Sequence, residues 1–238
     1  MMLNLRKTLS AALGLCLGAS LVSGQILVAF WDFNDEPVTD PLVNTPFAFA
    51  PNAGAQPTAE LSMVLADTGS PDTFGVRNEG TTINDIVNDP AEAGNSFSFG
   101  RGWRSRNATT SIAFDASSIT DAQPVELSFA INRFASEAVD QYQASYSLDG
   151  GDNFTNIDSP VDINQGVWEL HTIDFGTVLS GASDAIVRLT FLGGTTNWSP
   201  GHRTNLDNIA LTAIPEPRVY AALFGLLALG FVVWRRRR

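Results

Sequence analysis

The segment VELSFAIN, which runs from Val125 to Asn132, places a large apolar side chain at every second position. Successive side chains of a β-strand point to opposite faces of a sheet, so this alternation predicts a strand with one buried face. A second apolar row with the same spacing follows, at Tyr142, Ala144, Tyr146 and Leu148. This part of the chain is therefore expected to form sheet and not helix.

A hairpin turn follows the second row at residues 149–152 (DGGD), because Asp-Gly adopts the positive φ angles of a tight turn at low cost. Residues 154–157 are expected to pair back as the next strand. Ser147, Asp149, Gly151 and Phe154 also match a single Asp-box, in which the Ser and Asp side chains close the turn by hydrogen bonds. The motif occurs once, so it predicts a stabilised hairpin and not a propeller blade.

Other short runs rich in β-branched and aromatic residues are separated by Gly, Pro, Asn and Asp. They predict strands at residues 25–33, 47–49, 61–65, 96–99, 110–114, 167–175, 185–192 and 206–213. Residues 69–94 are rich in Gly, Asp, Asn and Pro, and are expected to form a long loop. Strands joined by turns, with no helix between them, predict an all-β fold, an antiparallel two-sheet sandwich over residues 25–213.

The N-terminus has the pattern of a secretory signal peptide over residues 1–24. Arg6 and Lys7 precede an apolar stretch at residues 9–22, and small residues follow up to Gly24. Leu15 precedes the single cysteine, Cys16, where a lipoprotein signal has a small residue, so we expect no lipidation. Cleavage after Gly24 would leave no cysteine, which excludes disulfides and thiol catalysis from the exported part.

The C-terminus, residues 214–238, has three consecutive parts. The triplet Pro215, Glu216 and Pro217 comes first, then the apolar run 219–234, then Arg235, Arg236, Arg237 and Arg238. As a helix the run would extend roughly 24 Å, which spans a bilayer core of about 30 Å only with interfacial anchoring. Because arginines stay on the cytoplasmic side, this transmembrane segment would leave the preceding domain outside. A buried core helix is the alternative, and the terminal arginines argue against it.

This order of parts resembles the PEP-CTERM sorting signal of Gram-negative bacteria. The resemblance implies passage through the secretion translocon and handling at the inner membrane by an exosortase-type membrane peptidase that acts near the triplet. Release to the cell surface or extracellular matrix would follow. Residues 31–33, 146–154 and 206–211 also resemble the jelly-roll sandwiches that often precede such signals. That resemblance implies that the first and last strands lie close together, near the membrane-proximal end.

The exported part is strongly acidic. Residues 25–217 contain all 25 acidic residues and seven arginines, a net charge of −18 against −11 for the whole chain. This charge argues against nucleic-acid binding, which needs a positive surface. It is compatible with divalent-cation binding or with solubility outside the cell, and we favour solubility.

Two segments are candidate contacts for a polysaccharide. The first contains Arg101, Trp103, Arg104 and Arg106, and the second contains Trp198 and His202. An exposed Trp can stack on a sugar ring while guanidinium groups bind its carboxylates or sulfates. The alternative, which we favour for the first segment, is that the arginines pair with the protein's own acids and Trp103 packs in the core.

A structural calcium ion is a further hypothesis. Asp32 lies at the end of the first predicted strand, Asp35 follows it and Asp207 lies in the last, so their carboxylates supply the hard oxygen ligands that calcium prefers. No loop has EF-hand spacing. The alternative is a solvated acidic rim in which Asp207 and Asn208 bond to a neighbouring loop.

The sequence offers no catalytic motif. His171 and His202 lack the HExxH spacing, and neither a GxSxG elbow nor a phosphate-binding glycine loop occurs. His171 is expected to face solvent or to lie near Glu169. We therefore predict a non-catalytic structural or adhesive protein. A carbohydrate-binding module is the first alternative, and a glycoside hydrolase or lyase, which needs two suitably spaced carboxylates, is the second.

Overall fold

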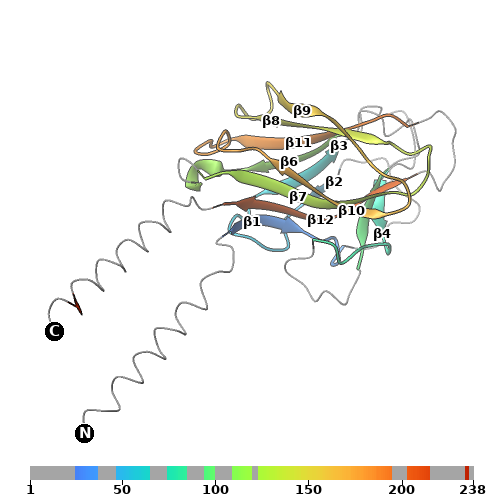
Figure 1. The fold of residues 1–238 in the computed structure, drawn as a ribbon, viewed down its shortest axis with the longest axis horizontal. Coiled ribbons are helices and arrows are strands. Elements are labelled where there is room, and N and C mark those ends of the chain that lie inside the picture. The colour runs from blue at the N-terminus through green and yellow to red at the C-terminus, as the bar shows by residue number, and fades with distance from the viewer. Residues whose placement is uncertain are drawn as a thin grey trace, which may run out of the picture.

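The computed structural model describes residues 25–36, 47–64, 74–84, 94–99, 109–119, 123–194, 203–214 and 234–235. Within these ranges the chain forms two six-stranded antiparallel sheets. One short 3₁₀ helix, η2 (Ala116–Ser118), precedes β7. The predicted all-β class with two antiparallel sheets is confirmed. Figure 1 shows that the strands run broadly along the length of the domain.

Sheet A has the order β10-β7-β12-β5-β4, with β1 also paired to β12. Its strands are β1 (Ile26–Trp31), β4 (Phe74–Arg77), β5 (Ser96–Phe99), β7 (Val125–Arg133), β10 (Trp168–Asp174) and β12 (Thr204–Ala213). Sheet B has the order β2-β3-β6-β11-β8-β9. Its strands are β2 (Phe47–Phe49), β3 (Glu60–Val64), β6 (Thr109–Phe114), β8 (Gln141–Ser147), β9 (Thr155–Asp162) and β11 (Ala185–Leu192).

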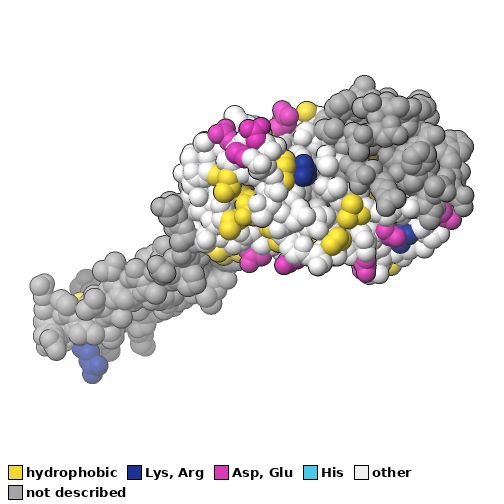
Figure 2. All heavy atoms as spheres, turned by 90° about the horizontal axis from the view of Figure 1, so that it is seen from above, with side chains coloured by type: hydrophobic (Ala, Val, Ile, Leu, Met, Phe, Trp, Pro, Cys, Tyr) yellow, Lys and Arg dark blue, Asp and Glu magenta, His cyan; other side chains and the backbone are white. Residues whose placement is uncertain are grey.

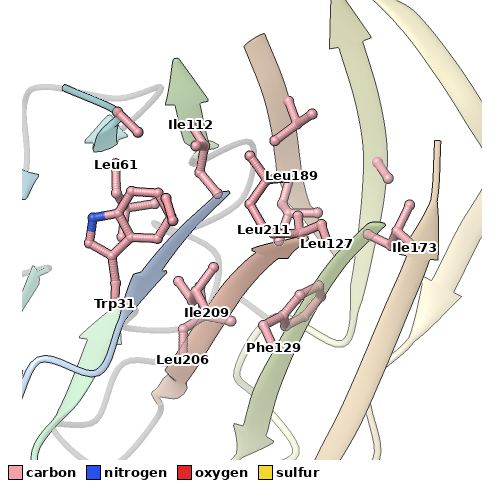
Figure 3. Close-up of a cluster of buried hydrophobic side chains, with 14 of the residues drawn as sticks. Trp31, Leu61, Ile112, Leu127, Phe129, Ile173, Leu189, Leu206, Ile209 and Leu211 are labelled. Carbon is pink, nitrogen blue, oxygen red and sulfur yellow. The ribbon is translucent and has the colours of Figure 1, made fainter. Parts of the chain in front are cut away.

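The core lies between the two sheets. Leu127, Phe129 and Ile131 of β7 are buried, as the alternation in VELSFAIN predicts. Figure 3 shows side chains of sheet A meeting those of Leu61, Ile112 and Leu189 of sheet B. The sandwich therefore closes by burying one apolar face of each sheet.

The first and last strands pair directly, as the jelly-roll resemblance implies. β1 is antiparallel to β12, with Ile26 opposite Ala213 and Trp31 opposite Ile209. All ten residues of β12 are buried, because the strand lies between β7 and β1 or β5, one of its faces packs in the core, and residues 81–83 are bonded to Asp207 and Asn208 on the other. Trp31 is also buried, and its Nε1 donates a 3.1 Å hydrogen bond to the carbonyl oxygen of Phe49.

Two predictions about strands are wrong. Residues 69–94 contain β4, which pairs with β5; its four residues are too few for an alternation to stand out among Gly, Pro and Asp. Leu148 is not part of the inward row but is 49% exposed, because β8 ends at Ser147 and the hairpin turn begins there.

The predicted targeting segments fall almost entirely outside the described residues. These are the signal peptide 1–24, the triplet Pro215, Glu216 and Pro217, the run 219–233, and Arg236, Arg237 and Arg238. Trp234 and Arg235 are helical and exposed. In the part of the chain that is described, no helix has the length and apolar character needed to cross a membrane. Export and anchoring remain predictions from sequence.

Candidate functional site

The outer face of sheet A carries a row of three polar or aromatic side chains. Trp168 on β10 pairs with Asn132 on β7, and Asn132 pairs with Asn205 on β12. Since Phe129 and Ile131 face the core, the alternation along β7 places Asn132 on the opposite face. We call the group formed by this row together with Glu79, Arg203 and Phe134 the sheet-A site.

Asn132 is the unusual member of the sheet-A site. Its side chain is only 5% exposed, yet its Oδ1 atom is buried and has no hydrogen-bond partner among the described residues. A buried amide oxygen without a partner costs about 1–3 kcal/mol of stability. Such a group is satisfied when a donor, such as a hydroxyl group of a ligand, reaches it.

The neighbouring Asn205 is fully bonded. Its Oδ1 accepts a 2.6 Å hydrogen bond from Ser98 Oγ, and its Nδ2 donates to Ser96 Oγ at 3.1 Å and to Glu79 Oε2 at 3.2 Å. Arg203 donates to the same carboxylate through Nε at 2.9 Å and through Nη2 at 2.5 Å. The bidentate pair fixes the position of Glu79. The polar floor of the site is therefore ordered before any ligand arrives.

Two aromatic side chains lie at this end of β7. Phe134 directly follows β7 and is 36% exposed, with the Arg203 guanidinium carbon 4.4 Å from its ring centroid. Trp168 is partly exposed at the start of β10. Binding sites for small molecules and sugars combine aromatic surface with a few polar groups of fixed orientation. The sheet-A site has both elements.

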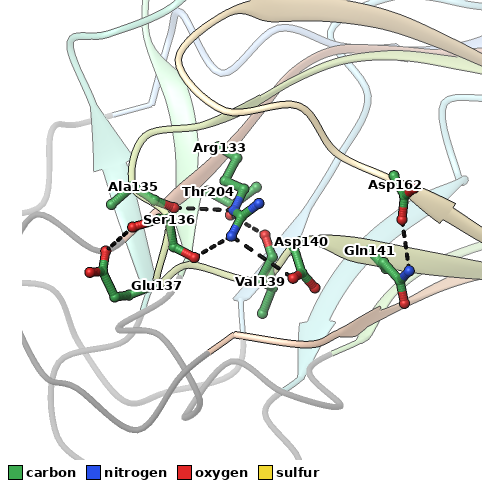
Figure 4. Close-up of polar contacts among 9 residues, drawn as sticks. All are labelled: Arg133, Ala135, Ser136, Glu137, Val139, Asp140, Gln141, Asp162 and Thr204. Carbon is green, nitrogen blue, oxygen red and sulfur yellow. Dashed lines mark hydrogen bonds and ion pairs between the residues drawn. The ribbon is translucent and has the colours of Figure 1, made fainter.

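Arg133 holds the turn that carries Phe134. Its Nε donates to the carbonyl oxygen of Ala135 at 3.1 Å and its Nη2 donates to that of Ser136, while Asp140 Oδ2 lies 3.9 Å from Nη2 (Figure 4). On the other side, the Gly166 amide donates to the Arg133 carbonyl oxygen at 2.8 Å. The chain segments before Trp168 and after Asn132 are thus tied to each other.

The residues predicted to contact a polysaccharide are Arg101, Trp103, Arg104, Arg106, Trp198 and His202, and all of them lie outside the described residues. Sequence reasoning did not identify Asn132, Trp168 or Glu79. The sequence did contain one signal for this site, namely Trp168. Ile173 of the same strand faces the core, and alternation places Glu169 and His171 on that face too. Trp168 must then lie on the outer face.

The residues of the calcium hypothesis have other partners. Asp207 is 1% exposed; its Oδ2 accepts the Thr81 amide at 2.7 Å and its Oδ1 accepts the Asn208 amide at 2.8 Å. Asn208 Nδ2 donates to the carbonyl oxygens of Thr81 at 2.6 Å and Ile83 at 2.9 Å. These bonds hold residues 79–84 on the outer face of sheet A, so the loop contact of the alternative is found, whereas its solvated rim is not, because Asp207 is buried.

Asp32 and Asp35, the other two residues of the calcium hypothesis, follow β1. Asp32 is buried and accepts the Asn34 amide at 3.1 Å, whereas Asp35 is exposed. Across the described ranges, no three His, Cys, Asp or Glu side chains form a group that could hold a metal ion. Calcium binding by Asp32, Asp35 and Asp207 therefore stays a prediction from oxygen-ligand supply.

His171 points inward from β10 to the edge of the core. Its Nδ1 lies 2.9 Å from the Tyr142 hydroxyl and its Nε2 lies 3.6 Å from Glu169 Oε2. Of the two expectations for His171, the position near Glu169 is therefore found, and the solvent-facing position is wrong because the side chain is only 14% exposed. Hydrogen bonds from Asn164 and then from His171 lower the pKa of Glu169, although desolvation opposes them. Burial raises the pKa of Tyr142 to about 12. Because Tyr142 is buried, its hydroxyl group links the two sheets through His171 and is not available as a nucleophile.

The Asp-box stabilises the hairpin as predicted. Ser147 Oγ donates to Asp149 Oδ1 at 2.5 Å and accepts the amides of Asp149 and Gly151 at 3.2 and 2.9 Å. Asp149 in turn accepts the Asn153 amide at 3.0 Å and its side-chain nitrogen at 2.8 Å. The hydrogen bonds from Ser147 and Asn153 hold the pKa of Asp149 well below its usual range.

No protein-family model matches the chain, and no curated protein matches its sequence. Similar solved structures include the N-terminal CBM22-1–CBM22-2 tandem domain of Xyn10C from Paenibacillus barcinonensis, at 12% identity and TM-score 0.46, over 83% of this chain and 49% of that one. The CBM22-1 xylan-binding domain of the same protein gives 9% identity and TM-score 0.41, over 80% and 96%. A cleaved adhesin domain of Lys-gingipain from Porphyromonas gingivalis gives 15% identity and TM-score 0.41, over 72% and 98%. At these values none of them assigns a role to a residue of this chain.

Proposed function

We propose that this chain is an exported, non-catalytic β-sandwich protein that binds extracellular polysaccharide through the sheet-A site and acts as an adhesive or structural component outside the cell. The observation that carries this proposal is the unpartnered, buried Oδ1 of Asn132 beside the partly exposed ring of Trp168. A sugar ring stacked on the indole would lie beside the Asn132 side chain, and rotation of that amide on binding would let a sugar hydroxyl group donate to Oδ1.

The charges at the site favour binding over hydrolysis. A glycosidase needs two carboxyl groups free to act on the sugar. Glu79, the carboxylate that contacts this row, accepts two hydrogen bonds from Arg203 and one from Asn205, which leaves it little free capacity for a substrate. Glu79 is therefore suited to hold the Arg203 and Asn205 side chains in place, and not to act on a sugar.

The external location rests on sequence. The signal-like segment 1–24 and the triplet, apolar run and arginines of residues 214–238 support export and exosortase-type sorting. The net charge of −18 over residues 25–217 supports solubility in an extracellular matrix. An extracellular polysaccharide is then a ligand that the domain would meet in that compartment.

Affinity gel electrophoresis of the full chain against soluble xylan, β-glucan and dextran tests the proposal. We expect at least one polysaccharide to retard the wild type. Trp168→Ala and Asn132→Ala should weaken that binding about tenfold or more, while Val178→Ala, an exposed change in a turn, should leave it unchanged. No retardation of the wild type, or equal retardation of all four proteins, would refute the proposal. Release of new reducing ends would instead favour the hydrolase alternative.

A further inference from the structure

The outer face of sheet B carries a row of small polar side chains around one arginine. Ser62 pairs with Ser111, Ser111 with Arg188, Arg188 with Ser145, and Ser145 with Asn156. The alternate residues of β11, such as Val187 and Leu189, face the core, so Arg188 lies on the outer face. The row crosses five of the six strands of sheet B.

Among the described residues, Arg188 has no anionic partner, which is unexpected for an arginine in so acidic a domain. Its guanidinium carbon lies 3.4 Å from the centroid of the Phe154 ring, and its Nε is buried without a hydrogen-bond partner. Among the described arginines, Arg203 binds a carboxylate and Arg133 binds two carbonyl oxygens, whereas Arg188 makes no such contact. Burial lowers the pKa of Arg188, but an arginine stays charged at any ordinary pH.

The described neighbours of Arg188 do not compensate its charge. Its direct cross-strand neighbours, Ser111 and Ser145, are uncharged. At the hairpin end, the Asp149 carboxylate is occupied by Ser147 and Asn153. Figure 2 shows one cluster of acidic side chains, with further acidic side chains scattered over this face and few basic side chains among largely uncharged atoms.

We propose that Arg188, held flat on Phe154, is a second binding site, which takes the carboxylate or sulfate group of an acidic polysaccharide. The planar guanidinium binds such groups through paired hydrogen bonds, and stacking on an aromatic ring fixes its plane. The short side chains of Ser62 and Ser111 are partly exposed, and they leave a low surface with hydroxyl groups beside Arg188 on which a sugar chain can lie. The net charge of −18 over residues 25–217 disfavours densely charged ligands, so a polymer with separated anionic groups fits better.

The two sites lie on the outer faces of opposite sheets. The sheet-A site faces away from the core on β7, β10 and β12, and Arg188 faces away from it on β11. A single domain with both sites can therefore bind two polysaccharide chains at once, and multivalent contacts raise overall affinity without any new interaction. This arrangement would suit a protein that cross-links a matrix.

The test measures binding of the full chain to polygalacturonate, which carries carboxylates, to dextran sulfate and to uncharged dextran. Wild type should bind at least one of the two anionic polymers more tightly than dextran, and less tightly as salt is raised. Arg188→Gln should lower that affinity about tenfold or more. It should leave unchanged the binding of any neutral polysaccharide that depends on Trp168.

Two further variants distinguish loss of the binding site from misfolding of the protein. Ser111→Glu places a carboxylate directly opposite Arg188 and keeps the arginine, and it should weaken anion binding as strongly as Arg188→Gln. Thr172→Glu makes the same change of charge at an exposed position of sheet A and should have little effect. The proposal is overturned if no anionic polymer binds the wild type, or if Ser111→Glu and Thr172→Glu bind equally well. Because the sheet-A site is tested with neutral polymers and Arg188 with anionic ones, the experiments can refute either proposal without refuting the other.

Discussion

The hydroxyl group of Tyr142 on β8 lies 2.9 Å from Nδ1 of His171 on β10, so one hydrogen bond joins sheet B to sheet A. Phe129 contacts both rings, with centroids 5.4 Å from Tyr142 and 5.8 Å from His171. The pKa of Tyr142 is raised to about 12 by burial, so its hydroxyl stays protonated and can donate to His171. The contact secures the edge of the sandwich at which β10 lies.

Tyr142→Phe should therefore destabilise the protein by about 1 kcal/mol, because His171 Nδ1 loses its partner while the aromatic packing remains. Urea denaturation measures the change. Tyr146→Phe on the same strand is the control, since no hydrogen bond of the described residues uses the Tyr146 hydroxyl, and it should be close to neutral. Equal effects of the two changes would show that the inter-sheet bond contributes nothing.

Glu126 and Asp174 are like charges placed directly opposite on β7 and β10. Burial, and then the charge of Asp174, raise the pKa of Glu126 above its ordinary value of 4.5. The folded protein thus holds this proton more tightly than the unfolded chain does, so stability should fall as pH rises from about 4.5 through the folded-state pKa.

Glu126→Gln should accordingly raise stability at pH 7 by roughly 0.2–1 kcal/mol, as expected for removal of a cross-strand repulsion. The gain should disappear below about pH 4, where the wild-type carboxyl group is protonated. Denaturation midpoints measured from pH 3 to 8 test this. Glu60→Gln, an exposed change at the start of β3, should show no such pH-dependent gain.

Asn208 holds residues 79–84 on sheet A and has a φ of 47°, which Asn and Gly tolerate best. Asn208→Gly should cost about 1–3 kcal/mol, because the two hydrogen bonds to Thr81 and Ile83 are lost. Asn208→Ala loses the same bonds and adds backbone strain, so its thermal midpoint should be lower still. A midpoint for Asn208→Ala at or above that of Asn208→Gly would contradict this explanation.

Ser147→Ala should loosen the β8–β9 hairpin, because Ser147 Oγ is buried and accepts the amides of Asp149 and Gly151. The expected loss of stability is about 1 kcal/mol. Amide hydrogen exchange at Gly151 should accelerate, whereas exchange in β12, at the centre of sheet A, should change little. Unchanged exchange at Gly151 would show that the Asp-box does not hold this turn.

Short-range pattern was enough to predict most of the strands. Residues 185–192 and 96–99 were predicted with the bounds that β11 and β5 have, because alternation and flanking turn residues act locally. β4 escaped prediction since four residues carry too little periodicity, and its pairing with β5 is supplied by a distant part of the chain. The Asp-box was predictable for the same reason as the long strands, as all its hydrogen bonds join residues within four positions.

The candidate sites were not predictable in the same way. The sheet-A site joins Glu79, Asn132, Trp168 and Asn205, which come together only through the order of β10, β7 and β12 and through residues 79–84. No short-range pattern shows that Asn132 Oδ1 lacks a donor, because that depends on which neighbours the sheet brings to it. The sequence by itself determined the all-β class, the hairpin and the acidic charge, since these follow from local alternation, turn chemistry and composition. Only the tertiary structure decided which polar groups remain without partners, because satisfaction of a buried hydrogen bond depends on contacts between residues that are far apart in the chain.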